Sequence, residues 1–254
     1  MSEETQPAAA ALAAESEGVA APRRGWPRAL RWALYGLGFL VAWPIVMTLV
    51  YAVAPPPFSN VMLLRALGGA GIDKQWVSLD EMSPWLPRAV IASEDARFCQ
   101  HRGVDWIEFQ SVIDDALERD EAPVRGASTI PMQTAKNLFL WDGRFAIRKV
   151  LELPLAMWMD LIWSKRRMME IYLNIVEWAP GVYGAEAAAW HHFGKPAKKL
   201  NKTEAARLAA VLPNPIRRNA GKPSKGVRAI ASRILVRMAG IGPYLTCLAP
   251  PSRL

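Results

Sequence analysis

Residues 85–103 read WLPRAVIASEDARFCQHRG, and the interpretation of the chain starts from this stretch. Leu86, Val90 and Glu94 are spaced by four residues, so on a helix they share one face. Glu94 then lies at the end of an apolar helix face, with Asp95 beside it. Partial burial and a neighbouring negative charge both raise the pKa of a carboxyl group towards neutrality, where a carboxylate can act as a base.

Glu94 could also form an ordinary ion pair with Arg88 or Arg97, and a downstream cluster bears on that choice. Spacing of four places Arg148 and Glu152 on one helix surface, so a second carboxylate lies among basic residues. The polar members of the cluster are Ser128, Thr129, Gln133, Lys136, Asn137, Arg144, Arg148 and Lys149. Two carboxylates and several cations suit sugar transfer from a phosphate leaving group, because one carboxylate activates the acceptor hydroxyl while cations stabilise the departing charge. A solvated charged face would have the same spacing.

Beyond residue 55, apolar residues recur with a period near 3.6, and no convincing alternating strand pattern or internal repeat is found. The expected helices lie around residues 85–98, 106–117, 134–140, 149–163, 165–173, 184–193, 203–212 and 227–238. This pattern predicts a mostly α domain of about 200 residues.

The segment 150–163 is apolar nearly all round, and at 14 residues it is too short to span a bilayer. We interpret it as a buried central helix. The alternative is that part of it, together with Met168 and Met169, contacts a membrane.

An uncharged run of 23 residues, 32–54, follows an arginine cluster and is long enough to cross a bilayer as a helix. Because no Lys or Arg follows until Arg65, the positive-inside rule places residues 1–31 in the cytoplasm and the rest of the chain outside it. A cleaved signal peptide is the alternative, but the run is longer than a usual signal core and Pro55 follows it. The expected organisation is a disordered, basic tail at 1–31, a transmembrane helix at 32–54, a linker at 55–74 and one domain at 75–254.

Composition narrows the remaining classes of protein. The chain has 254 residues and a formal net charge of +8. Because 52% of its residues are hydrophobic, a disordered chain is excluded. Cys99 and Cys247 can form at most one bridge, and we expect free thiols. Residues 195–254 hold 13 basic residues and one acidic residue, which favours a phosphate-rich partner. Since the predicted topology places this segment outside the cytoplasm, we expect Lys198, Lys199, Lys202, Arg217 and Arg218 to contact anionic lipid, and no nucleic-acid partner.

Five short signatures together resemble those of the peptidoglycan glycosyltransferases, glycosyltransferase family 51. They are Glu94-Asp95-x-x-Phe98-x-x-His101-x-Gly103, Gly126-x-Ser128-Thr129-Ile130-x-x-Gln133-x-x-Lys136-Asn137, Arg148-Lys149-x-x-Glu152, Ser164-Lys165 through Glu170-x-Tyr172-Leu173-Asn174, and Gly184 to Gly194-Lys195 with Glu204-Ala205-Ala206-x-Leu208. The resemblance runs in order over roughly residues 75–215. The sequence departs from the family pattern at Ala127, Pro131, Met132 and His192, which concern loop shape more than charge.

The resemblance implies a lysozyme-like helical glycosyltransferase domain that polymerises lipid II and releases undecaprenyl pyrophosphate. By motif, Glu94 is the catalytic base, and Glu152 is a second essential carboxylate that positions cations or holds a metal such as Mg²⁺. The substrate-binding residues that the resemblance implies are Asp95, Phe98, Ser128, Thr129, Gln133, Lys136, Asn137, Arg144, Arg148 and Lys149.

The expected partners are lipid II, the growing glycan chain, the membrane and, as candidates, other proteins of cell-wall synthesis or division. The expected location is the bacterial inner membrane, with a periplasmic domain in a monofunctional enzyme. The alternatives are a lysozyme-like lytic enzyme and a non-catalytic membrane-anchored scaffold.

Overall fold

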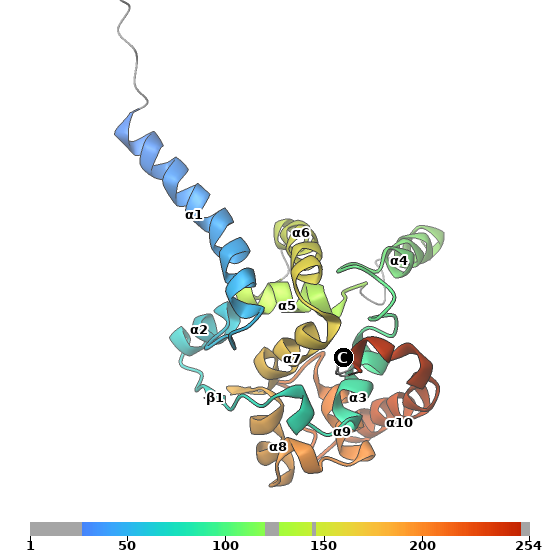
Figure 1. Ribbon diagram of the computed structural model, residues 1–254. Helices are drawn as coiled ribbons and strands as arrows, with labels where there is room; N and C mark the ends of the chain where they lie inside the picture. The colour runs from blue at the N-terminus through green and yellow to red at the C-terminus, as the bar shows by residue number, and fades with distance from the viewer. Residues whose placement is uncertain (1–26, 120–126, 144–145, 250–254) are drawn as a thin grey trace, which may run out of the picture. The chain divides into compact units, whose positions relative to one another are not determined.

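The computed structural model describes residues 27–119, 127–143 and 146–249, and Figure 1 shows the arrangement of their helices. The chain divides into two compact units, Met1–Ala42 and Trp43–Leu254. The second unit holds the site and is described below.

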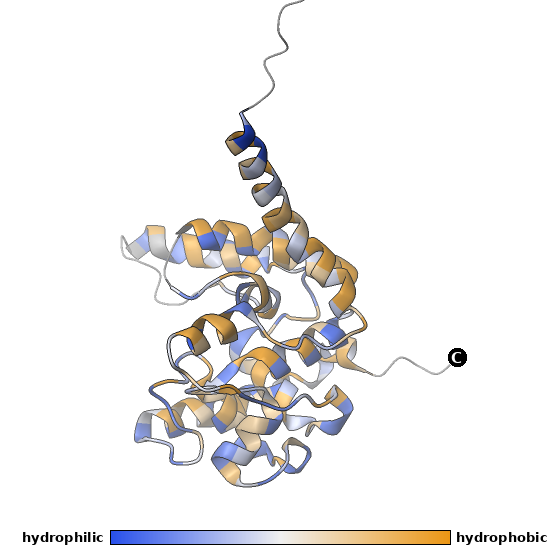
Figure 2. Cartoon of the chain, turned by 90° about the vertical axis from the view of Figure 1, so that its left-hand side faces the viewer, coloured by the Kyte–Doolittle hydropathy of each residue, from blue (hydrophilic) through white to orange (hydrophobic). Residues whose placement is uncertain are grey.

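Helix α1, Arg28–Tyr51, is the one described helix that is long and apolar enough to cross a membrane. Its most apolar window has a mean hydropathy of 2.0, and only 11% of that window is buried in the protein. Figure 2 shows a blue first turn followed by a largely orange helix, in keeping with the arginines that precede the apolar run. The helix overlaps the run predicted at 32–54 but begins at Arg28.

The second unit is built from nine described α-helices and a small sheet. The helices are α2 (Asn60–Leu67), α3 (Trp85–Glu94), α4 (Trp106–Arg119), α5 (Ile130–Phe139), α6 (Ala146–Ile162), α7 (Lys165–Ile175), α8 (Ala185–Phe193), α9 (Lys202–Val211) and α10 (Lys225–Gly240). The prediction of a mostly α fold is therefore confirmed.

Three short strands were not predicted. They are β1 (Asp73–Lys74), β2 (Glu177–Ala179) and β3 (Val182–Tyr183), in the order β1-β3-β2, with β1 parallel and β2 antiparallel to β3. Strands of two or three residues are too short to show an alternating pattern. The segment 55–74, expected as a linker, contains α2, which packs on α5, and β1, which pairs with β3.

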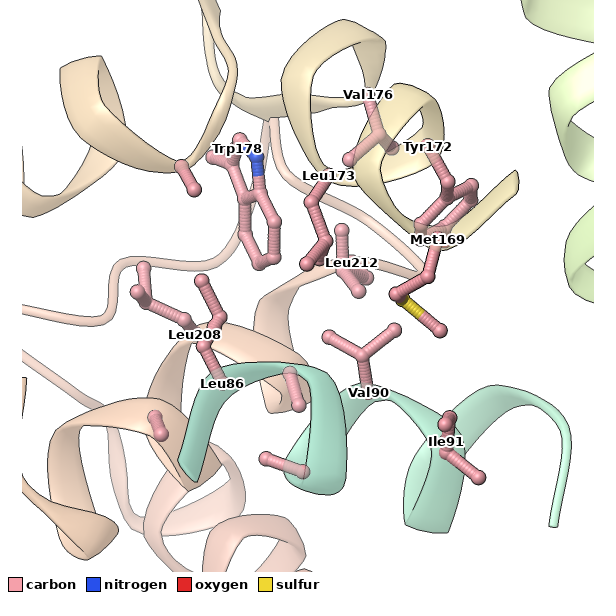
Figure 3. Packing of buried hydrophobic residues seen from close by; sticks show 14 of the residues in the cluster. Leu86, Val90, Ile91, Met169, Tyr172, Leu173, Val176, Trp178, Leu208 and Leu212 are labelled. Atoms are coloured by element: carbon pink, nitrogen blue, oxygen red, sulfur yellow. The ribbon is translucent and has the colours of Figure 1, made fainter. Parts of the chain in front are cut away.

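Helix α7 is the centre of the core. Its residues Met168, Met169, Ile171, Tyr172, Leu173, Asn174 and Ile175 are all buried. Figure 3 shows Leu86 and Val90 of α3 facing Met169 and Leu173, with Leu208 and Leu212 closing the cluster. Because Leu86 and Val90 lie on the same face of α3 as predicted, this core orients the end of α3, where Glu94 lies.

The prediction that 150–163 forms a buried central helix is wrong. Helix α6 packs one face against α5 and leaves the other uncovered, with Val150 65% and Leu161 72% exposed. Met168 and Met169, named as alternative membrane contacts, are fully buried. An apolar stretch does not reveal which of its faces is covered, because that depends on the neighbours that tertiary structure supplies.

The expectation of free thiols is also wrong. Cys99 and Cys247 form a disulfide with a Cα–Cα distance of 5.5 Å across 148 residues of sequence. The last turns of the chain, η3 (Gly242–Tyr244) and η4 (Thr246–Leu248), bring Cys247 to the loop after α3, and Arg166 donates to the Leu248 carbonyl at 2.8 Å. Two cysteines 148 residues apart form no local sequence pattern from which this disulfide could be predicted.

Candidate active site

A cavity of about 440 Å³ opens at the C-terminal end of α3. Its lining includes Glu94, Asp105, Glu108, Ser128, Thr129 and Arg237, so α3, α4, the start of α5 and the last turn of α10 meet around it. The structure thus brings the first two sequence signatures to one cavity, which we call the Glu94 cleft.

The Glu94 carboxylate is held by uncharged donors. Ser93 Oγ donates to Oε1 at 3.1 Å, and Gln133 Nε2 donates to Oε2 at 3.1 Å. The alternative ion pairs are not formed, since Arg97 pairs with Asp105 at 3.3 Å and Arg88 lies over the Trp85 ring. The carboxylate is therefore free to accept a proton from a ligand in the cleft.

Burial raises the pKa of Glu94, as its position on an apolar helix face predicts. The hydrogen bonds from Gln133 and Ser93 oppose this rise, the negative charge of Asp95 adds to it, and the positive charge of Arg218 opposes it. A carboxylate with a raised pKa is a stronger base than an ordinary glutamate.

Tyr172 orients the amide that contacts Glu94. Its hydroxyl donates to Gln133 Oε1 at 2.9 Å, so the Gln133 amino group is left to face Glu94. Burial raises the pKa of Tyr172 well above its usual value, which keeps the hydroxyl protonated as a donor. From the sequence, Tyr172 was identified only as a member of the fourth signature, and no role was predicted for it.

Asp95 lines the Glu94 cleft and links α3 to α5. Its carboxylate accepts from the Ile130 backbone at 2.9 Å, and His101 Nε2 lies 2.9 Å from its other oxygen. Phe98, three residues on, is fully buried in the core. Asp95 and Phe98, which were expected to bind substrate, make internal contacts that hold the wall of the cleft.

The start of α5 is anchored in the same way. The Thr129 hydroxyl caps the helix and donates to the Gly103 carbonyl at 2.6 Å. Gly103 has a φ of 76°, and a Cβ there would meet the Ala156 carbonyl oxygen at 2.7 Å, so only glycine fits against α6. Asn137 is buried and donates to the Gln133 carbonyl at 2.8 Å, so it too supports the site from within.

Glu152 is held by cations instead of neutral donors. Its side chain lies 3.1 Å from Arg148 Nε and 2.8 Å from Lys149 Nζ, and the residue is only 1% exposed. Lys149 also donates to the Ser128 hydroxyl at the Glu94 cleft. The pairing of Arg148 with Glu152 agrees with their spacing of four, and Glu152 places Lys149 next to the cleft.

A second group of cations surrounds Asp142. Lys136 Nζ lies 3.7 Å from one carboxylate oxygen, and Arg65 donates to the other. Burial alone would raise the pKa of Asp142, but the Arg65 hydrogen bond and the charges of Lys136, Arg65 and Arg148 hold it below its usual value. The sequence analysis missed Arg65 and Asp142, and the predicted Arg144 lies outside the described residues.

The surroundings of Glu152 do not fit a magnesium site. Magnesium prefers several oxygen ligands, whereas Arg148 and Lys149 occupy this carboxylate. Within 27–119, 127–143 and 146–249, no group of three His, Cys, Asp or Glu side chains could hold a metal ion. We derive no step through a metal.

Comparison with known proteins gives a consistent result. The transglycosylase family profile matches residues 61–239. A "Biosynthetic peptidoglycan transglycosylase" of Rhizobium meliloti (strain 1021) is 54% identical over 192 residues, which cover 76% of this chain and 80% of that protein. A protein of the same name from Mesorhizobium japonicum is 49% identical over 239 residues, which cover 93% of this chain and 100% of that protein. The chain therefore belongs to the transglycosylase family.

Proposed function

We propose that this chain is a peptidoglycan glycosyltransferase that polymerises lipid II and releases undecaprenyl pyrophosphate. The names of its relatives support the peptidoglycan substrate. The observation that carries the proposal is the contrast within the site. The Glu94 carboxylate accepts its hydrogen bonds from the neutral side chains of Ser93 and Gln133, while lysine and arginine side chains gather around Glu152 and Asp142.

The reaction uses these two environments for different tasks. Glu94 accepts the proton of the acceptor sugar's 4-hydroxyl as that oxygen bonds to the anomeric carbon of the growing chain. The bond from this carbon to the pyrophosphate oxygen breaks, and its electron pair leaves with the lipid pyrophosphate. Lys136, Arg148 and Lys149 stabilise the negative charge that grows on the leaving group. Ser93 and Gln133 hold the Glu94 carboxylate in place.

Exposed apolar side chains on two helices that both pack on α5 support membrane contact by the domain. They are Leu63, Leu64 and Leu67 of α2 and Ile147, Val150, Leu151 and Leu161 of α6, and we refer to them together as the apolar surface. Patches of this kind mark interaction sites with membranes or proteins, and a lipid-linked substrate requires the former. We propose that this surface meets the outer leaflet of the bacterial inner membrane, with residues 1–31 cytoplasmic and the domain periplasmic.

Of the five basic residues first expected to hold lipid, the three lysines lie elsewhere in the domain. Lys198 and Lys199 belong to η2 (Ala197–Lys199), and Lys202 begins α9. Figure 1 shows α9 in the lower part of the domain and α6 in the upper part. We therefore favour the apolar surface over these lysines as the membrane contact. Alkaline phosphatase fused after Arg65 should be active, and an inactive fusion would overturn the orientation.

The activity is tested with purified lipid II and the full-length chain in detergent. We expect glycan polymer and an equivalent release of undecaprenyl pyrophosphate. Shortening of preformed glycan without polymer formation would favour a lytic enzyme, and the absence of both reactions would favour a scaffold.

A further inference from the structure

A second cavity of about 410 Å³ adjoins the Glu94 cleft. The two share the lining residues Ala92, Ala96, Arg97 and Arg237, so they lie side by side. The second cavity is also lined by Gln100 of the loop after α3 and by Tyr244 of η3. We call this second cavity, with Arg97, Gln100, Arg237 and Tyr244, the α10 groove.

The side chains of the α10 groove are suited to a sugar chain. Gln100 and Arg237 are exposed, Tyr244 is 50% exposed, and Arg237 makes no hydrogen bond or ion pair with another described residue. Planar guanidinium and amide groups can form paired hydrogen bonds with neighbouring hydroxyl or carboxylate oxygens. An exposed tyrosine ring can pack against the apolar face of a sugar and still offer its hydroxyl.

The groove is held open by a covalent link. Cys99 precedes Gln100 and bonds to Cys247, three residues after Tyr244, so the disulfide ties the two walls together. The catalytic chemistry described above uses none of Gln100, Arg237, Tyr244 or the disulfide. A preformed groove avoids the entropy cost of ordering its walls when a ligand binds.

We propose that the α10 groove binds sugar units of the growing glycan strand next to the unit that reacts at Glu94. The inference rests on the proposed function, since it assumes that the strand occupies the Glu94 cleft. Its consequence concerns polymer length. A site for sugars beyond the reacting unit retains a long strand between additions, whereas the first coupling of two lipid II molecules does not require it.

Binding is measured with the full-length Glu94→Gln protein and a lipid-free tetrasaccharide of alternating N-acetylglucosamine and N-acetylmuramic acid, so that no turnover occurs. We expect Arg237→Ala and Tyr244→Ala, each added to this background, to weaken binding about tenfold, as loss of one charge-assisted or stacking contact would. Arg233→Ala is the matched control, because Arg233 is an exposed arginine of α10 outside the groove lining. Unchanged affinity in both groove variants would overturn the proposal.

Product length is measured with lipid II and otherwise wild-type protein. We expect the Gln100→Ala and Tyr244→Ala variants, whose residues line the α10 groove but not the Glu94 cleft, to form the first coupled product at the wild-type rate but to release shorter strands. Strands of wild-type length from both variants would contradict the proposal. A wild-type chain that makes no polymer would instead refute the proposed function, and tetrasaccharide binding would then still report on the groove.

Discussion

Glu94 and Glu152 are both glutamates, but their surroundings differ in charge. Glu94 faces a cleft and accepts hydrogen bonds from Ser93 and Gln133, both neutral, and burial raises its pKa. Glu152 is almost completely buried, and two cations lie within 3.1 Å of its oxygens. The comparison teaches that the environment, not the residue type, separates a proton acceptor from a group that positions charge.

The largest expected effect is on the rate of polymerisation, when Glu94 can no longer act as a base. Glu94→Gln keeps the shape of the side chain but cannot take a proton, so polymerisation of lipid II should fall by about 10²–10⁴-fold. Strand formation is followed on gels, after circular dichroism has shown the variant to be folded. Glu118→Gln, an exposed carboxylate of α4, is the control and should retain the wild-type rate.

If folded Glu94→Gln polymerises near the wild-type rate while Glu152→Gln is inactive, the two roles are reversed. If both remain active, the assignment of chemistry to the two carboxylates is wrong.

The next effect is on stability, and it should differ in sign between the two sites. Glu152→Gln leaves Arg148 and Lys149 without their counter-charge and should cost about 1–3 kcal/mol, less than a fully buried pair because Lys149 is partly exposed. Glu94 has a raised pKa in the folded state, so its contribution to stability is present below pH 4.5 and is lost as pH rises through the folded pKa. Glu94→Gln should therefore be at least as stable as the wild type at pH 7.

Urea unfolding at pH 7 measures both changes. Equal losses of unfolding free energy in the two variants would show that the carboxylates do not differ as described.

A smaller effect should follow from loss of the Tyr172 hydroxyl. Tyr172→Phe preserves the buried ring but frees the Gln133 amide, at a cost of about 0.5–1.5 kcal/mol, or roughly two- to tenfold in rate. Because the Gln133 hydrogen bond favours the ionised form of Glu94, its weakening should raise the pKa of Glu94 further. The pH dependence of polymerisation should then shift to higher pH.

A merely structural role for Tyr172 would lower the rate without moving the pH profile. In a Gln133→Leu background, the Tyr172→Phe change should have no further effect on the profile, since the two residues act through one contact.

Local spacing in the sequence predicted the contacts that lie on one helix. The period of 3.6 predicts α3 with its apolar face, and spacing of four predicts the Arg148–Glu152 pair, because helix geometry alone determines both. Contacts between distant residues could not be obtained in this way. Gln133 meets Glu94 across 39 residues, and this pair depends on how α3 and α5 pack around their shared core. Arg65 meets Asp142 across 77 residues, and this pair depends on the packing of α2 against α5.

The pH–rate profile of lipid II polymerisation tests the central claim most directly. The account predicts that activity falls as pH is lowered through the pKa of Glu94, at a pH above the usual glutamate value near 4.5. This acidic limb should persist in the residual activity of Glu152→Gln and disappear from that of Glu94→Gln. An acidic limb that remains in Glu94→Gln, or that disappears in Glu152→Gln, would contradict the account.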